Sequence, residues 1–219
     1  MKSRVWVVLL ALIGSGIGAF GLARAKAVRR ARLAVVVSVT TPEPEKHKVT
    51  ADMLASAGQR VKSLAPTFRG IDADGSTQDL AELIKSGPVV LVFIKDGCPC
   101  SASASPYFNA LNTLYGGRLR MLGIIDGDAE VARRWGSANR VTFPILPDPR
   151  VEIAKSYGAT NSAFVALVDR EGRIDELWPG YAASMLHELN RRASALAGLT
   201  QEPFDASDAP EELYSGCPF

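Results

Sequence analysis

The sequence predicts an α/β fold in which helices cover both faces of a mixed central β-sheet. Residues 89–94 form a continuous apolar run rich in β-branched side chains, which is typical of a strand buried on both faces. Strand-like and helix-like segments alternate after it, as parallel crossover units require. Residues 163–168 and 174–178 flank a polar turn at residues 169–173, which indicates an antiparallel hairpin.

The predicted elements follow the order β-α-β-α-β-α-β-β-α. Apolar side chains recur at helical spacing in the helices, and the strands are short apolar runs closed by turn residues. Gly158 is a natural residue for ending the helix before it, and the Pro-Asp-Pro at residues 147–149 ends a strand. The predicted strands are residues 89–94, 119–125, 142–146, 163–168 and 174–178, and the predicted helices are residues 51–62, 102–114, 129–135, 151–157 and 182–197.

Changes in composition divide the chain into four parts. Residues 1–32 carry seven Lys or Arg and no acid, and are predicted to be a membrane anchor or signal segment. Residues 33–61 are a linker that can form a short helix. Residues 62–198 form the compact domain, and residues 199–219 form an extended acidic tail.

The apolar run at residues 5–22 has two interpretations. It holds 18 uncharged residues, close to the roughly 20 that a membrane-spanning helix needs. A signal peptide would use residues 5–13 as its core and be cut after residues 23–25. We expect a retained anchor, because five basic residues directly after the small-residue site are unusual for a mature amino terminus.

Composition excludes several kinds of protein. The chain has 219 residues and a net charge of +2, without a basic stripe bearing aromatic residues, so a nucleic-acid partner is not expected. Its two histidines, His47 and His187, are too few for a His-rich metal site, and three cysteines are too few for a disulfide scaffold. Nothing in the sequence indicates a cofactor.

The segment Gly97-Cys98-Pro99-Cys100-Ser101 carries the strongest chemical signal. It lies between the strand at residues 89–94 and the helix at residues 102–114, and amides at a helix start stabilise a thiolate. Cys98 is therefore the candidate nucleophile. Lys95 adds a nearby positive charge, and we expect Ser101 to cap the helix or to hydrogen-bond the sulfur.

An ordered set of further motifs gives the chain a resemblance. Residues 62–198 resemble the thioredoxin-like redoxins of the AhpC/TSA (alkyl hydroperoxide reductase/thiol-specific antioxidant) group and its membrane-tethered relatives. The similar segments are Leu64-Ala65-Pro66-Thr67-Phe68 with Asp74-Gly75, the strand before Cys98, Pro106, the run at residues 143–148, Tyr157-Gly158-Ala159 and the run at residues 164–174. The resemblance implies a thioredoxin-like three-layer sandwich in which residues 160–162 face the cysteine turn.

The sequence departs from both standard active sites of that group. A thioredoxin-type Cys-x-x-Cys would place its second cysteine at Ser101, and Ala163 stands at the position of the family's cis-proline. Peroxiredoxins have an active-site arginine there, which is also absent. The Thr or Ser that peroxiredoxins place three residues before the reactive cysteine is Lys95 before Cys98 and Gly97 before Cys100.

Two cysteines are candidate partners for Cys98. A bridge to Cys100 would need a strained geometry, and strained bridges are the labile ones. Cys217 would reach Cys98 if the tail folded back over the turn, and their pairing would convert a sulfenic acid into a disulfide before further oxidation. The sequence leaves the choice open, and it also allows Cys217 to be a terminal thiol without a role.

The resemblance implies a membrane-anchored, thiol-dependent oxidoreductase with antioxidant or disulfide-exchange activity. Cys98 would attack a peroxide or a protein disulfide, Cys100 or Cys217 would resolve the product, and an external thiol would reduce the enzyme again. We favour peroxide, because disulfide exchange usually uses Cys-x-x-Cys and the proline replaced by Ala163. The alternatives are a Cu(I)-binding chaperone that uses all three cysteines and a degenerate redoxin that only scaffolds a partner.

The side of the membrane on which the domain lies is open as well. The positive-inside rule places it in the cytoplasm, because more basic residues follow residues 5–22 than precede them. Thioredoxin-like domains behind one amino-terminal span usually face outward, and by this analogy we expect an extracytoplasmic domain.

Overall fold

A computed structural model describes residues 47–219 of the chain. The predicted anchor or signal segment, residues 1–32, lies outside the described residues, as does the first half of the linker at residues 33–61. Between His47 and Phe219, every helix is too short or too polar to cross a membrane.

A five-stranded sheet with the order β6-β5-β4-β7-β8 lies at the centre of the domain. Strand β4 (Val89–Ile94) is parallel to β5 (Arg120–Ile125), which is parallel to β6 (Ile145–Pro147). On its other side β4 is antiparallel to β7 (Phe164–Val168), and β7 is antiparallel to β8 (Ile174–Trp178). This order confirms the predicted mixed sheet with two parallel crossovers and a closing hairpin.

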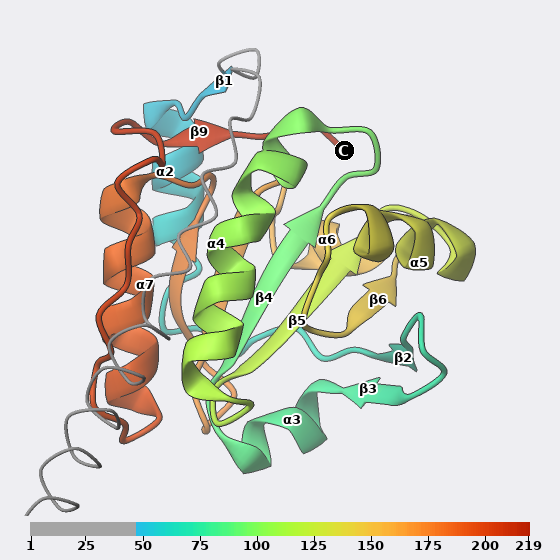
Figure 1. Cartoon of the computed structure of the whole chain (residues 1–219), viewed down its shortest axis with the longest axis horizontal. Coiled ribbons are helices and arrows are strands. Elements are labelled where there is room, and N and C mark those ends of the chain that lie inside the picture. Colours follow the sequence, from blue (N-terminus) through green and yellow to red (C-terminus); the bar gives the residue numbers. More distant parts are fainter. Residues whose placement is uncertain (1–46) are drawn as a thin grey trace, which may run out of the picture. The chain divides into compact units, whose positions relative to one another are not determined.

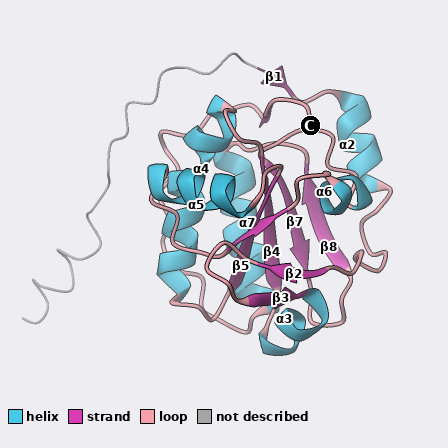
Figure 2. Ribbon diagram, turned by 90° about the vertical axis from the view of Figure 1, so that its right-hand side faces the viewer, coloured by secondary structure: helices cyan, strands magenta, loops and turns pink. Residues whose placement is uncertain are grey.

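Helices cover the sheet on both faces and bury β4 completely. Helices α4 (Pro99–Tyr115), α5 (Ala129–Ala138) and α7 (Ala183–Leu196) contribute to the core on one face, where α4 and α7 are prominent (Figure 1). The other face is covered by α2 (Ala51–Gly58), α3 (Leu80–Ser86) and α6 (Glu152–Ser156), with α2 and α6 on the side away from α4 (Figure 2).

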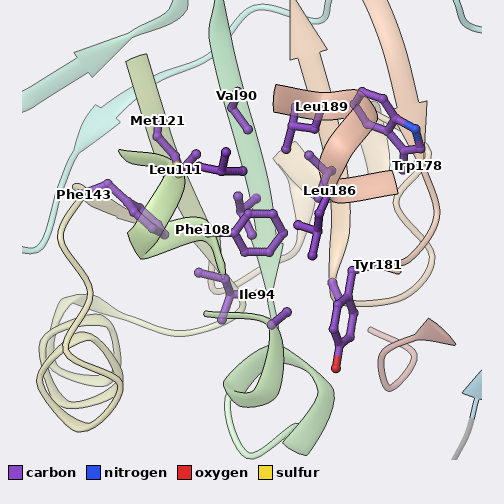
Figure 3. Packing of buried hydrophobic residues seen from close by; sticks show 14 of the residues in the cluster. Val90, Ile94, Phe108, Leu111, Met121, Phe143, Trp178, Tyr181, Leu186 and Leu189 are labelled. Atoms are coloured by element: carbon purple, nitrogen blue, oxygen red, sulfur yellow. The ribbon is translucent and has the colours of Figure 1, made fainter. Parts of the chain in front are cut away.

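The alternation of side chains along β4 explains its continuous apolar sequence. Val90, Val92 and Ile94 belong to the core beneath α4 and α7, whereas Val89, Leu91 and Phe93 belong to the core on the opposite face. Figure 3 shows Phe108 of α4 and Leu186 of α7 in the first of these cores, packed above β4. Burial on both faces fixes the end of β4, and therefore the position of the cysteine turn that follows it.

Helix α4 tolerates an internal proline because a side chain replaces the missing donor. Pro106 has no N–H for the carbonyl of Ala102, four residues before it. The hydroxyl of Ser105 donates to that carbonyl at 3.1 Å. The helix therefore continues to Tyr115, where Gly116 ends it in a left-handed conformation with φ of 55°.

The structure corrects the prediction for residues 142–146. Strand β6 spans only Ile145–Pro147, because side chains of α4 engage the backbone of Thr142. Asn109 accepts from the Thr142 N–H at 3.0 Å, and Asn112 donates to the Thr142 carbonyl at 2.8 Å. These bonds use the backbone groups that a sheet partner would need.

Sequence patterns missed a short hairpin and the helix after it. Strands β2 (Arg69–Ile71) and β3 (Thr77–Asp79) form a separate two-stranded sheet, followed by α3. The buried carboxylate of Asp72 accepts from the Ser76 N–H at 2.8 Å and from the Gln78 side chain at 2.7 Å. Strands of three residues with polar turns are too short to show an alternation of apolar residues.

The tail at residues 199–219 follows the side of the domain and returns to the cysteine turn. Asn190 of α7 binds both the Tyr115 hydroxyl and the Glu202 carbonyl, the latter at 3.0 Å. The tail then forms β9 (Tyr214–Ser215), which is antiparallel to β1 (His47–Lys48). Its end lies beside the turn between β4 and α4 (Figure 1).

We expect Tyr115→Phe to destabilise the domain more than Tyr157→Phe. Loss of the Tyr115 hydroxyl leaves the buried Asn190 amide without that partner and removes the acceptor of the Glu202 N–H, at 3.4 Å. A lost partner of this kind costs about 1–3 kcal/mol. Among residues 47–219, the Tyr157 hydroxyl makes one hydrogen bond, to the Pro66 carbonyl at 2.9 Å. Urea unfolding measures the free energy of unfolding of both variants. If Tyr115→Phe lowers it by no more than Tyr157→Phe does, the Tyr115 hydroxyl does not link α7 to the tail as described.

Candidate active site

The fold brings all three cysteines to one place. Cys98 is the residue that precedes the first turn of α4, Cys100 lies within that turn, and Cys217 arrives on the tail. All three are free thiols, with Cys98 and Cys100 buried and Cys217 partly exposed. The site predicted at Cys98 thus includes both of the candidate partners, Cys100 and Cys217.

The tail reaches Cys98 by pairing with the segment before β7. The Gly216 N–H donates to the Ser162 carbonyl at 2.8 Å, the Ser162 N–H donates to the Cys217 carbonyl at 3.0 Å, and the Phe219 N–H donates to the Thr160 carbonyl at 3.0 Å. An antiparallel bridge joins Asn161 to Pro218 between these bonds. The end of the tail is therefore an added strand along residues 160–162.

An irregularity in this pairing sends one backbone donor to the sulfur. In a regular antiparallel pair, the N–H groups of Ser162 and Cys217 would each bond the other residue's carbonyl. Here Gly216 takes the Ser162 carbonyl, so that two tail residues oppose one, as in a β-bulge. The Cys217 N–H is released and donates to the Cys98 Sγ at 3.2 Å.

Three further donors converge on the same sulfur. The hydroxyl of Ser162, a fully buried residue, donates to the Cys98 Sγ at 3.1 Å. The thiols of Cys100 and Cys217 also hydrogen-bond it. Each donor favours the ionised form, because a thiolate accepts hydrogen bonds and a thiol accepts them weakly.

These donors shift the pKa values of the three cysteines apart. The Cys100 thiol, followed by the Cys217 N–H and the Ser162 hydroxyl, lowers the pKa of Cys98 to about 3 against the opposing effect of burial. The hydrogen bond to Cys98, together with burial, raises the pKa of Cys100. Burial and the bond to Cys98 raise the pKa of Cys217 to about 11, although the charge of Lys95 acts against this. Cys98 is thus the thiolate of the site and its neighbours are protonated.

The groups that stabilise the Cys98 thiolate differ from those that the sequence predicts. Backbone amides at the start of α4 were expected to hold the thiolate, but Pro99 occupies the first helical position and has no N–H. The roles predicted for Ser101 give way to another contact, since its hydroxyl accepts from the Lys95 N–H at 3.2 Å, and the start of α4 has no side-chain cap bond. Cys98 is only 3% exposed, yet its sulfur meets polar donors from the tail and from Ser162 rather than aliphatic groups alone.

Ion pairs and hydrogen bonds of charged residues stabilise the turn that carries Cys98. Asp126, at the end of β5, accepts from the Asp96 N–H at 2.7 Å and from the Lys95 ammonium at 3.1 Å. Arg134 of α5 pairs with the Asp96 carboxylate at 2.7 Å. Asp126 thus holds the turn at the end of β5, whereas Asp128 caps α5 and accepts from two of its amides.

Ala163 takes the backbone position that the resemblance assigned to a cis-proline. Its φ of 55° lies in the left-handed region, and the residue is buried. A non-glycine residue pays roughly 1–2 kcal/mol for this conformation. The Ala163 N–H donates to the Phe93 carbonyl at 2.9 Å, a bond that proline could not make. Alanine therefore preserves a link between β4 and the segment that carries Ser162.

Two polar side chains near the cysteines received no predicted role. The resemblance placed Ser162 opposite the cysteine turn without making it a donor to the sulfur, and nothing in the sequence indicated Tyr181. The Tyr181 hydroxyl hydrogen-bonds Ser103 of α4, and burial, together with the charges of the nearby cysteines, raises its pKa. Trp135, Tyr157 and Trp178 are buried core residues, and His187 is exposed.

The Cu(I) alternative finds no assembled ligand set. Within residues 47–219, no group of three or more His, Cys, Asp or Glu side chains is arranged to hold a metal ion. The hydrogen bonds among Cys98, Cys100 and Cys217 instead leave two of the three sulfurs protonated.

Comparison with known proteins identifies a family and supports the fold. The model of the AhpC/TSA family matches residues 61–177, more than half of the 219-residue chain. No curated protein matches the chain. Among solved structures, the thioredoxin domain of a thiol-disulfide oxidoreductase from Bacteroides vulgatus is 19% identical, with a TM-score of 0.54 over 61% of this chain and 97% of that one. Peroxidoxin BcpB from Mycobacterium tuberculosis is 17% identical, with a TM-score of 0.53 over 64% and 96%. At these identities, the two structures establish the thioredoxin-like fold alone.

We expect the Cys98 thiolate to persist well below neutral pH. A free cysteine titrates near pH 8.5, whereas a pKa of about 3 keeps Cys98 ionised down to mildly acidic pH. The ultraviolet absorption of the thiolate, measured as the difference from a Cys98→Ser chain, should therefore stay constant from about pH 8 to about pH 5.

Ser162→Ala should raise the midpoint of this titration, because it removes one donor to the sulfur. Ser215→Ala is the matched control, since its hydroxyl donates to the His47 carbonyl and not to the sulfur. A Cys98 absorption that appears only above about pH 8 would show that the donors do not hold the thiolate.

Proposed function

Because the chain belongs to the AhpC/TSA family, we propose that it is a thiol-dependent oxidoreductase in which Cys98 reduces a peroxide and Cys217 resolves the product. One observation carries this proposal. The tail delivers both the backbone N–H and the thiol of Cys217 to the sulfur of an ionised Cys98. Nucleophile and resolving thiol are thus already side by side before the reaction.

In the first step, the Cys98 thiolate attacks one oxygen of the peroxide. An S–O bond forms, the O–O bond breaks, and the departing oxygen takes a proton to leave as water or an alcohol. The sulfur is oxidised by two electrons to a sulfenic acid while the peroxide is reduced. The low pKa of Cys98, about 3, keeps the attacking form populated at neutral pH.

In the second step, Cys217 attacks the sulfenic sulfur. An S–S bond forms, the S–O bond breaks, and the hydroxyl leaves as water with the proton of the Cys217 thiol. Oxidation of Cys98 removes the negative charge that helps to raise the Cys217 pKa to about 11, while the charge of Lys95, which lowers that pKa, remains. The first step therefore prepares Cys217 for the second.

Cys217 is better suited than Cys100 to form the disulfide. Cys100 is separated from Cys98 by Pro99 alone, and a bridge between cysteines two positions apart requires strained geometry. It lies fixed and buried in the first turn of α4, whereas Cys217 lies on a segment held mainly by backbone bonds. An external dithiol then reduces the Cys98–Cys217 disulfide and restores both thiols.

Cysteine variants separate these roles. We expect Cys98→Ser to abolish thiol-dependent consumption of hydrogen peroxide, since serine is not ionised at neutral pH. Cys217→Ser should still react once, but should accumulate sulfenic acid and lose at least about tenfold in turnover. Cys100→Ser should keep the disulfide, although its Cys98 pKa should rise, because one donor is lost.

Mass spectrometry after one equivalent of peroxide identifies the paired cysteines. The expected pair is Cys98 with Cys217, in the unaltered chain and in Cys100→Ser alike. Full turnover by Cys98→Ser would remove the nucleophile assignment. A Cys98–Cys100 bridge in the unaltered chain would instead make Cys100 the resolving residue.

We also propose that residues 5–22 hold the enzyme at a membrane with its domain on the extracytoplasmic side. The supporting features are the length and apolar character of that run and the basic residues on both sides of it. In membranes from expressing cells, the full-length chain should remain in the pellet after alkaline extraction, and protease added to intact spheroplasts should digest the domain. A soluble chain shortened at its amino terminus would identify a cleaved signal peptide.

A further inference from the structure

The first step of the proposed reaction needs a proton, and the surroundings of Cys98 restrict its source. Attack by the thiolate releases hydroxide or an alkoxide, which are poor leaving groups unless an acid protonates them as the O–O bond breaks. Cys98 is only 3% exposed, so little solvent touches its side chain. An acid held beside the sulfur is therefore better placed than bulk water to protonate the departing oxygen.

Cys217 lies on the side of the sulfur that is open to solvent. Ser162 and Cys100, which also donate to the Cys98 Sγ, are 0% and 1% exposed, whereas Cys217 is partly exposed. A peroxide that comes from solvent therefore meets the sulfur beside Cys217. In an in-line displacement the departing oxygen points away from Cys98, toward that same open side.

The Cys217 thiol is also the suitable acid among the groups that surround the sulfur. A thiol with an ordinary pKa of about 8.5 is protonated at neutral pH and is far more acidic than water, whose pKa is about 15.7. Burial and the bond to Cys98 raise the pKa of Cys217 to about 11, which leaves it below that of water. The hydroxyl of Ser162 is a much weaker acid. The bond to Cys98 and burial raise the pKa of Cys100, so that thiol keeps its proton.

Lys95 has a supporting task on the same side. Its ammonium group pairs with the Asp126 carboxylate at 3.1 Å, and this ion pair favours the protonated amine. Against the effects of burial and of Cys98, the charge of Lys95 lowers the pKa of Cys217. Lys95 thus stabilises the thiolate that Cys217 becomes after it has lost its proton.

We propose that the Cys217 thiol is the general acid of the first step, so that a single proton transfer releases the reduced oxygen and creates the nucleophile of the second step. The inference deepens the proposed function and rests on it, because it gives the resolving cysteine an earlier role. Cys217 acts twice in each turnover, first as an acid and then as a nucleophile.

Atoms and electrons balance in this sequence. The Cys98 sulfur forms an S–O bond, the O–O bond breaks, and the departing oxygen takes the Cys217 proton to leave as water or an alcohol. The Cys217 thiolate then attacks the sulfenic sulfur, an S–S bond forms, and the S–O bond breaks. The hydroxide released there takes a proton from solvent, so the proton balance of the whole turnover is unchanged. The peroxide gains the two electrons that the two cysteines lose.

Two peroxides with different leaving groups test this role. Hydrogen peroxide releases hydroxide, which needs a proton, whereas peracetic acid releases acetate, a weak base that does not. Loss of the free Cys98 thiol reports the first step, and is followed by acid quenching, alkylation of the unfolded chain and mass spectrometry. Cys217→Ala should slow this step at least about tenfold with hydrogen peroxide and less than about twofold with peracetic acid.

The substitution removes the thiol and keeps the backbone donor. The Cys217 N–H, which donates to the Cys98 Sγ at 3.2 Å, is present in Cys217→Ala as well. Backbone bonds between residues 216–219 and 160–162 set its position. Cys217→Ser, which is close to cysteine in size, covers the case in which the alanine variant does not fold. It should show the same selective loss, because a hydroxyl is a much weaker acid than a thiol.

Ser162→Ala is the matched control for a lost hydrogen bond. It also removes one side-chain donor to the Cys98 Sγ, at 3.1 Å, but it does not remove the acid. Its rate constants with hydrogen peroxide and with peracetic acid should therefore change by the same factor. A selective loss with hydrogen peroxide is thus expected only where the Cys217 thiol is absent.

Two results would overturn the proposal. One is a first step in Cys217→Ala and Cys217→Ser that is unchanged with hydrogen peroxide, or slowed equally with both peroxides. The other is a selective loss in Lys95→Gln with none in Cys217→Ser, which would assign the proton to Lys95. Either result leaves Cys98 as the nucleophile and Cys217 as the resolving thiol. Failure of the proposed function is a different outcome, because it would show as full turnover by Cys98→Ser.

Discussion

The site depends on the hydrogen bonds that replace water around one buried sulfur. A buried anion is costly unless donors compensate for the lost solvent, and Cys98 receives them from Cys100, Ser162 and Cys217. Two of these residues lie outside the cysteine turn, more than 60 positions along the chain. The pairing of the tail, the bulge at Gly216 and the conformation of Ala163 all serve to position those donors.

Most of the domain follows from patterns that the sequence displays. The apolar run of β4 predicts a strand with both faces covered, and the polar turn before β8 predicts the hairpin, since burial and turn chemistry act locally. Cys98 could be predicted as the candidate nucleophile because its place between a buried strand and a helix is visible in the sequence. By contrast, β6 lies later than predicted, because Asn109 and Asn112 of α4 bind the backbone of Thr142 in its place.

The rest of the site could not be predicted, because it rests on backbone contacts between distant segments. Hydrogen bonds between residues 160–162 and 216–219 involve main-chain groups that every residue shares, so they leave no compositional trace. Within residues 216–219, packing restricts the residue type at Gly216, and a single glycine near other small residues is not distinctive. Prediction therefore reached the three cysteines that meet at the turn but placed the donors to Cys98 in the amides of α4, whereas they are the Cys100 thiol, the Ser162 hydroxyl and the tail at Cys217.

The pairing of β1 with β9 has a mechanical consequence. His47 is paired with Ser215, and Ser215 directly precedes the glycine that sets the bulge over Cys98. A pulling force on the chain on the amino-terminal side of His47 would therefore act first on β9, the strand that leads to Cys217, and only then on the central sheet. The same two-residue ladder that closes the domain also links the thiol centre physically to whatever holds the amino-terminal side of the chain.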